Sequence, residues 1–125
     1  MRTRALNRFE RCAQVARWVN HEFDLWDEGA VTIEWRPRRL FYEGAEVKGL
    51  TFERGGQLVI QLSTVTCDRV DNSIETLLHE IAHVHLWDTG RGIRHGREFW
   101  VTFGSYSDAF DERGSADSRS YSVEL

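Results

Sequence analysis

The stretch His79-Glu80-Ile81-Ala82-His83 is the feature that most constrains what this chain can fold into. It lies in a segment whose apolar residues recur at helical spacing, and positions four apart share one face of an α-helix. The two imidazoles are therefore predicted to lie side by side, with Glu80 about 100° around the same helix. These side chains are costly to bury unless a partner satisfies them, and a metal ion would do so. The stretch therefore predicts a metal-binding helix, and the alternative is a pair of hydrogen-bonded histidines without a metal.

This HExxH pattern is typical of zinc peptidases, in which the glutamate handles a proton of the attacking water. A catalytic zinc usually has three protein ligands and one open position, so a third ligand is needed. The candidates that follow the motif are Asp88, His95 and Glu98. Asp88 lies near the predicted end of the helix, and Glu98 lies on the next predicted helix. We favour His95, because it follows a glycine-containing loop that can fold back toward the motif.

The apolar pattern predicts an α+β fold with one domain over residues 1–111 and a polar tail over 112–125. Helices are predicted over about 3–23, from Asn72 or Ser73 to about Trp87, and over about 96–110. Strands are predicted over 31–36, 40–42, 46–53 and 57–63. Gly55-Gly56 predicts a hairpin between the last two strands, and hence a small antiparallel sheet of about three strands. If 57–63 is an exposed edge, an extended peptide could pair with it.

Charge and composition limit the other classes of function. The 125 residues carry a formal net charge of −4, which argues against a general nucleic-acid coat. Positive charge is concentrated in the first predicted helix, at Arg2, Arg4, Arg8, Arg11 and Arg17. This face is interpreted either as a solvated surface or as a weak site for an anionic partner.

The cysteine count and hydropathy indicate a cytoplasmic protein. Cys12 and Cys67 are too few for a disulfide framework, and each is expected to behave as a small buried hydrophobe. No apolar run is long enough to span a membrane, so no membrane association is expected. Nor does an apolar segment typical of a secretion signal follow the N-terminal arginines.

Two separated motifs carry a family resemblance. Leu77-Leu78-His79-Glu80-Ile81-Ala82-His83, followed by His95-Gly96-Arg97-Glu98-Phe99-Trp100, resembles the SprT-like metalloproteases. The resemblance implies a zincin-like core, Zn²⁺ as cofactor, and a protein or peptide substrate. It also implies that His79, His83 and His95 are zinc ligands and that Glu80 is the general base. Many relatives add a cysteine-paired zinc ribbon, whereas no cysteine follows Trp100 here, so the DNA association known in the family is only weakly expected.

Several roles remain as alternatives. One alternative is a non-catalytic, zinc-stabilised binding module, and another is association with nucleic acid through the first helix. For an oxyanion stabiliser the candidates are Tyr106, Arg94 and His85, with His85 more readily interpreted as structural or exposed. Glu75, one turn before His79, is expected to be solvated.

Overall fold

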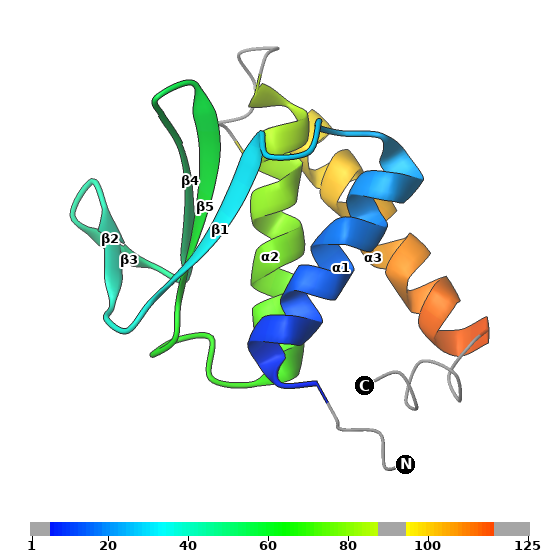
Figure 1. The fold of residues 1–125 in the computed structure, drawn as a ribbon, viewed down its shortest axis with the longest axis horizontal. Helices are drawn as coiled ribbons and strands as arrows, with labels where there is room; N and C mark the ends of the chain where they lie inside the picture. The colour runs from blue at the N-terminus through cyan, green and yellow to red at the C-terminus, as the bar shows by residue number, and fades with distance from the viewer. Residues whose placement is uncertain (1–5, 88–94, 117–125) are drawn as a thin grey trace.

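The computed structural model describes residues 6–87 and 95–116, the last five of them by their helical backbone alone. Its elements confirm the predicted α+β class and are arranged as shown in Figure 1. The helices are α1 (Arg8–Phe23), α2 (Val70–His85) and α3 (Arg97–Ala116). The strands are β1 (Val31–Arg36), β2 (Leu40–Tyr42), β3 (Ala45–Val47), β4 (Gly49–Arg54) and β5 (Gln57–Ser63).

The main sheet has the strand order β1-β5-β4. β4 and β5 are antiparallel, as the Gly55-Gly56 turn predicts, and both of these glycines have positive φ angles of 57° and 82°. β1, however, pairs with β5 in parallel, so the prediction of an antiparallel sheet is wrong for this strand. The predicted strand 46–53 is divided at Lys48, and its first part pairs with β2 in a separate antiparallel hairpin.

The central position of β5 also corrects the prediction about the exposed edge. β5 is covered on both sides by β1 and β4, so it offers no edge to a peptide. β4 is an edge strand of this sheet. One side of β4 pairs with β5, and no other described strand pairs with its other side. The side chains of Val59 and Ile60 point to opposite faces of the sheet and both are buried, which suits a strand in the middle of a sheet.

The helix boundaries follow local capping. α1 begins after Asn7, whose side chain accepts a hydrogen bond from the backbone of Glu10 at 2.8 Å. α2 begins at Val70, earlier than predicted, and the Asn72 side chain accepts a hydrogen bond from the backbone N–H of Arg69. α3 continues to Ala116, so the first residues of the predicted tail are helical. Residues 117–125, the rest of that prediction, lie outside the described part of the chain.

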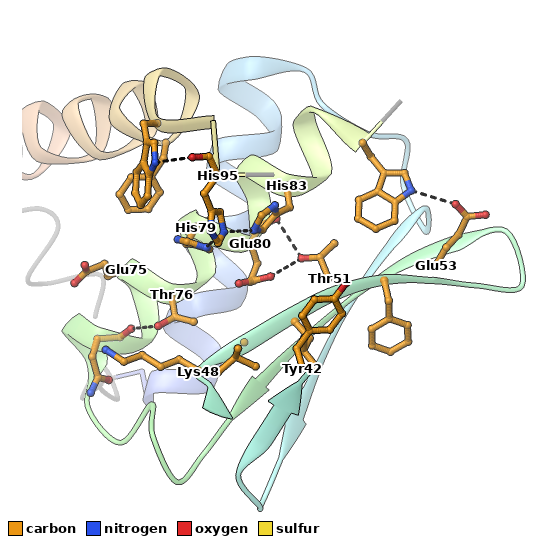
Figure 2. A pocket seen from close by; sticks show the side chains of 18 residues that line it. Tyr42, Lys48, Thr51, Glu53, Glu75, Thr76, His79, Glu80, His83 and His95 are labelled. Carbon is orange, nitrogen blue, oxygen red and sulfur yellow. Dashed lines mark hydrogen bonds between the residues drawn. The ribbon is translucent and has the colours of Figure 1, made fainter. Parts of the chain in front are cut away.

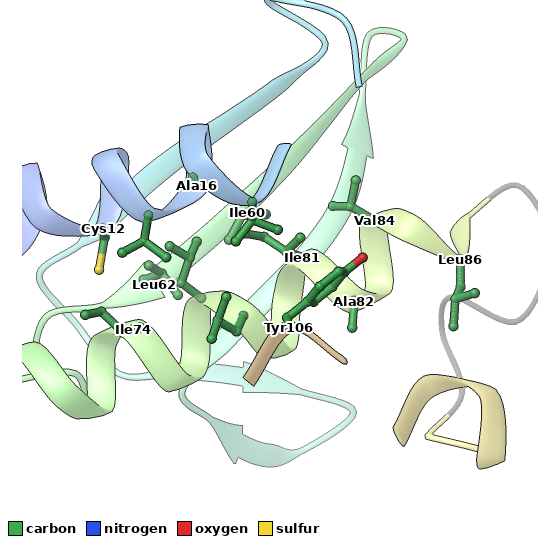
Figure 3. Close-up of a cluster of buried hydrophobic side chains, with 14 of the residues drawn as sticks. Cys12, Ala16, Ile60, Leu62, Ile74, Ile81, Ala82, Val84, Leu86 and Tyr106 are labelled. Carbon is green, nitrogen blue, oxygen red and sulfur yellow. The ribbon is translucent and has the colours of Figure 1, made fainter. Parts of the chain in front are cut away.

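Figure 1 shows the three helices gathered on one side of the sheet, with α2 lying next to the strands. Their apolar faces meet β5 in one core, shown in Figure 3. Ile60 and Leu62 of β5 and Leu77 and Ile81 of α2 are fully buried there. Burying aliphatic side chains of this size stabilises the fold by about 1.5–3 kcal/mol each. The core therefore fixes α2 against the sheet and sets the orientation of its remaining face.

Both cysteines are free and buried. This matches the prediction that they act as small hydrophobes, and burial raises the pKa of the Cys12 thiol to about 12. A thiol with this pKa stays protonated at neutral pH and is a poor nucleophile. Over the described residues, no helix is long and apolar enough to cross a membrane.

Candidate metal centre

α2 positions two histidines by its helical period. Its apolar face is held in the core, which leaves His79 and His83 on a face that looks toward the start of α3 (Figure 2). His95 lies two residues before the first residue of α3. The Nε2 atom of His95 is 3.1 Å from the Nε2 atom of His79 and 3.1 Å from that of His83. Among the described residues, these three form the cluster whose ligand atoms all lie within 4.8 Å of one another.

This spacing fits a tetrahedral metal ion. Nitrogens bound to zinc at about 2.0–2.1 Å lie roughly 3.3 Å apart in a tetrahedral site. Two neutral imidazoles can share one hydrogen bond, but His95 approaches both neighbours through the same nitrogen. A cation between the three lone pairs would satisfy all of them at once. The donor set, three imidazoles and no thiolate, is one that leaves an open position in catalytic zinc sites.

The surroundings of His79 favour the neutral form of its imidazole, which has a nitrogen lone pair that can bind a metal ion. Burial, together with the neighbouring His83 and His95, lowers the pKa of His79 to about 4. His79 is therefore neutral at physiological pH, as a metal ligand must be. The buried Phe99 ring packs against all three imidazoles, with centroid distances of 4.7, 4.5 and 4.8 Å to His79, His83 and His95. The indole of Trp100 donates a hydrogen bond of 3.0 Å to the carbonyl of His95, which fixes the start of α3.

Glu80 lies beside the histidine cluster and is held from the sheet. Its residue surface is 4% exposed. The hydroxyl of Thr51 on β4 donates a hydrogen bond of 2.7 Å to its Oε1 atom. Burial raises the pKa of Glu80 to about 7, and the bond from Thr51 opposes that rise by favouring the ionised form.

Gly49 allows β4 to approach α2 this closely. A Cβ atom added there would lie 3.0 Å from Cγ2 of Thr76 and 3.1 Å from both the Gln61 carbonyl oxygen and Cγ of Glu80. These contacts are tighter than ordinary van der Waals separations. The absence of a side chain at Gly49 therefore brings Thr51 within hydrogen-bonding distance of Glu80.

A cavity of about 550 Å³ opens over the histidines and Glu80. Every residue from Val47 to Glu53 lines it. Successive side chains of a strand point to opposite faces, so an unbroken run of lining residues means that the edge of β4 borders the cavity. The cavity therefore joins a candidate metal site to an edge of β4 with which no other described strand pairs.

The remaining predicted residues have other positions. Glu98 is exposed in the first turn of α3 and does not join the histidine cluster. His85 and Tyr106 contact each other through Nδ1 and the hydroxyl, and neither lines the cavity, so they are poorly placed as oxyanion stabilisers. Glu75 is exposed, as predicted, and also borders the cavity. The predictions for Asp88 and Arg94 fall on residues outside the described part of the chain.

Sequence reasoning did not find Thr51 or Gly49. Gly49 gave one signal, since an isolated glycine within a strand pattern can mark a close approach of the backbone. The hydroxyl of Thr51 gave none, because threonine is an ordinary strand residue and its partner is 29 residues away in the sequence.

Comparison with models of known protein families matches residues 8–114 to the SprT-like family. This match includes α1, all five strands, α2 and most of α3. Neither the comparison with curated proteins nor the comparison with solved structures gave a match.

Proposed function

The chain belongs to the SprT-like family, and on this basis we propose that it is a zinc-dependent peptidase that hydrolyses peptide bonds. The observation that supports this most strongly is the convergence of three imidazoles beside a buried carboxylate at one cavity. Two imidazoles could be structural. Three imidazoles whose spacing suits zinc favour a catalytic site. The neighbouring carboxylate of Glu80, which can accept and return a proton, favours hydrolysis.

His79, His83 and His95 would hold the zinc ion. When bound, zinc polarises the scissile carbonyl and lowers the pKa of a water molecule toward 7. Glu80 accepts a proton from the attacking water and returns it to the leaving nitrogen. Its raised pKa of about 7 suits both steps, because an acid–base group works best when its pKa lies near the working pH. Thr51 orients the carboxylate by holding one of its oxygens.

The edge of β4 would position the substrate. An extended peptide can pair with an unpaired strand edge through backbone hydrogen bonds. This pairing depends little on the sequence of the peptide. β4 borders the cavity along its length and carries Thr51 beside Glu80. The peptide bond to be cleaved would then lie between β4 and the histidine cluster.

Substitution of Glu80 by Gln tests this proposal. The amide keeps the size of the side chain but cannot take up the proton. We expect the Glu80→Gln protein to bind as much zinc as the wild type and to lose cleavage of an unfolded protein substrate such as casein. Undiminished cleavage by this variant would contradict the mechanism.

A non-catalytic zinc module is the second candidate, and it is less favoured because the open cavity lies directly over the histidines. A nucleic-acid partner on the first helix is weaker still. Arg11 is 3% exposed, and Arg8 donates a hydrogen bond of 3.1 Å to the Cys67 carbonyl. Binding of that kind would weaken steeply with added salt, which a titration can measure.

A further inference from the structure

One wall of the cavity is aromatic on the His79 side. Trp100 and Phe103 of α3 line the cavity, and their ring centroids lie 6.1 and 5.8 Å from that of His79. Trp100 remains 52% exposed although it is one of the largest apolar side chains of the protein. Its indole N–H is already bonded to the His95 carbonyl, so its free surface is apolar. Phe103 packs against the core, and its ring centroid lies 6.1 Å from that of Trp100.

A second aromatic wall lies on the His83 side. Trp87 follows His83 by four residues and lines the cavity together with Phe52 of β4. The indole N–H of Trp87 donates a hydrogen bond of 3.2 Å to the carboxylate of Glu53, shown as a dashed line in Figure 2. The guanidinium of Arg54 lies 5.2 Å from the centre of the Phe52 ring. Each of these two rings thus has a polar or charged partner beside the cavity that it lines.

The two walls are separated along β4. The start of β4 lies against Thr76 and Glu80, since a Cβ atom at Gly49 would meet both. Its later residue Glu53 contacts Trp87. β4 and α2 therefore run in the same direction along the cavity, with the Thr51–Glu80 contact between the two ends. A peptide paired with β4 would place residues on one side of the cleaved bond near Trp100 and those on the other side near Trp87.

We propose that these walls are two apolar subsites, which select large apolar side chains on both sides of the cleaved bond. This inference rests on the proposed peptidase function, because it assumes that a peptide occupies the cavity along β4. The substrate class is then an extended, unfolded protein segment rich in aromatic or large aliphatic residues. Such residues are normally buried in folded proteins, so the cleft would favour unfolded chains over native ones.

The location of the exposed aromatics supports this assignment. Four exposed apolar residues do not line the cavity, namely Phe41, Val65, Val70 and Val101. Trp100 does, and on the hairpin side so does the exposed Tyr42. Exposed apolar surface gathered at a cleft is typical of a binding site, whereas single exposed residues elsewhere are ordinary.

Binding of four matched peptides tests the proposal. All have the same length and differ only in carrying Phe or Ala at the residue before and the residue after one central bond. Their affinity is measured by fluorescence anisotropy with the zinc-loaded Glu80→Gln protein, which should bind without cleaving. We expect the peptide with two Phe residues to bind most tightly and each Phe-to-Ala change to weaken binding about tenfold. Equal affinity for all four peptides, or binding of none, would overturn the proposal.

Variants of the walls assign the subsites. Trp100→Ala is expected to remove the preference for Phe on one side of the bond, and Trp87→Ala the preference on the other side. Val101→Ala is the matched control, because Val101 is 61% exposed next to Trp100 but does not line the cavity. Preferences that survive both tryptophan substitutions would contradict the assignment.

The same peptides separate this inference from the proposed function. If the wild-type protein cleaves none of them while the ranking of affinities holds, the subsites stand and the peptidase proposal fails. If it cleaves all four with equal kcat/KM, the peptidase proposal stands and the subsites fail.

Discussion

The Thr51 hydroxyl donates a hydrogen bond of 2.7 Å to the Glu80 carboxylate, joining the edge strand β4 to the helix that carries both motif histidines. The bond connects the element that would bind a peptide to the group that would move the proton. Its charge-assisted character means that it both orients Glu80 and favours the ionised, proton-accepting form.

Loss of the Thr51 hydroxyl should reduce turnover more than substrate binding. A hydrogen bond to a charged group contributes about 1.5–3 kcal/mol, so Thr51→Val should lower kcat by about 10- to 100-fold and leave KM nearly unchanged. Thr51→Ser should restore most of the rate, because it keeps the hydroxyl. Steady-state kinetics on a fluorogenic peptide measures both effects.

The control for this pair is Thr32→Val on the exposed surface of β1, which makes the same chemical change away from the cavity. Zinc content should be equal in all of these proteins. A normal kcat in Thr51→Val would show that the hydrogen bond from Thr51 does not contribute to the function of Glu80.

A side chain at Gly49 should separate β4 from α2. The added Cβ of Gly49→Ala would press on Thr76, Gln61 and Glu80 at 3.0–3.1 Å, so we expect a loss of about 1–3 kcal/mol in the free energy of unfolding. Activity should fall as well, because the contact between Thr51 and Glu80 lengthens. Urea unfolding and peptide cleavage measure the two effects.

Gly104→Ala provides the matched comparison. Gly104 lies within α3, and a Cβ atom there would meet nothing within 4 Å. Alanine is favoured over glycine in a helix, so this variant should gain about 0.5–1 kcal/mol and keep its activity. Equal effects of the two substitutions would contradict the close approach at Gly49.

The buried Glu80 carboxylate should make the metal-free protein less stable as the pH rises. Burial raises the pKa of Glu80 from 4.5 to about 7 in the folded state. Because the folded pKa is the higher one, this group contributes its full stability below pH 4.5 and loses it as the pH rises through 7. The loss is at most about 3.4 kcal/mol, at 1.36 kcal/mol for each pKa unit.

Urea unfolding of the wild type and Glu80→Gln in a chelating buffer tests this dependence. The variant carries no charge at this position, so its advantage in unfolding free energy should be small at pH 5 and larger at pH 8. His79, whose pKa is lowered, changes stability in the opposite direction over acidic pH, but it is present in both proteins. An advantage that does not grow with pH would mean that Glu80 is not destabilised by burial.

Much of the candidate site could be predicted because its chemistry is local. His79, Glu80 and His83 follow from the period of one helix, and their mutual placement needs no information from the rest of the fold. His95 could be favoured over its rivals because a glycine-containing loop precedes it. Thr51 and Gly49 could not be identified as site residues, because their roles depend on how one strand packs against one helix.

The same distinction applies to the fold. The β4–β5 hairpin is encoded by two glycines between the strands, and the structure has it as predicted. The position of β1 depends on a contact between residues far apart in the sequence. β1 pairs with the side of β5 that β4 does not occupy. A hairpin rule concerns neighbours in sequence and does not determine this contact, so the parallel pairing was missed. Likewise, α3 extends past the predicted end because Ser, Gly and charged residues weaken a helical pattern without preventing a helix.

The zinc content of three proteins tests the histidine cluster most directly. Wild-type, His95→Ala and Glu98→Ala proteins are loaded with zinc, dialysed against a weak chelator and analysed by mass spectrometry for metal per chain. We predict one zinc ion in the wild type and in Glu98→Ala, and almost none in His95→Ala. Zinc retained by His95→Ala but lost from Glu98→Ala would contradict the three-histidine centre.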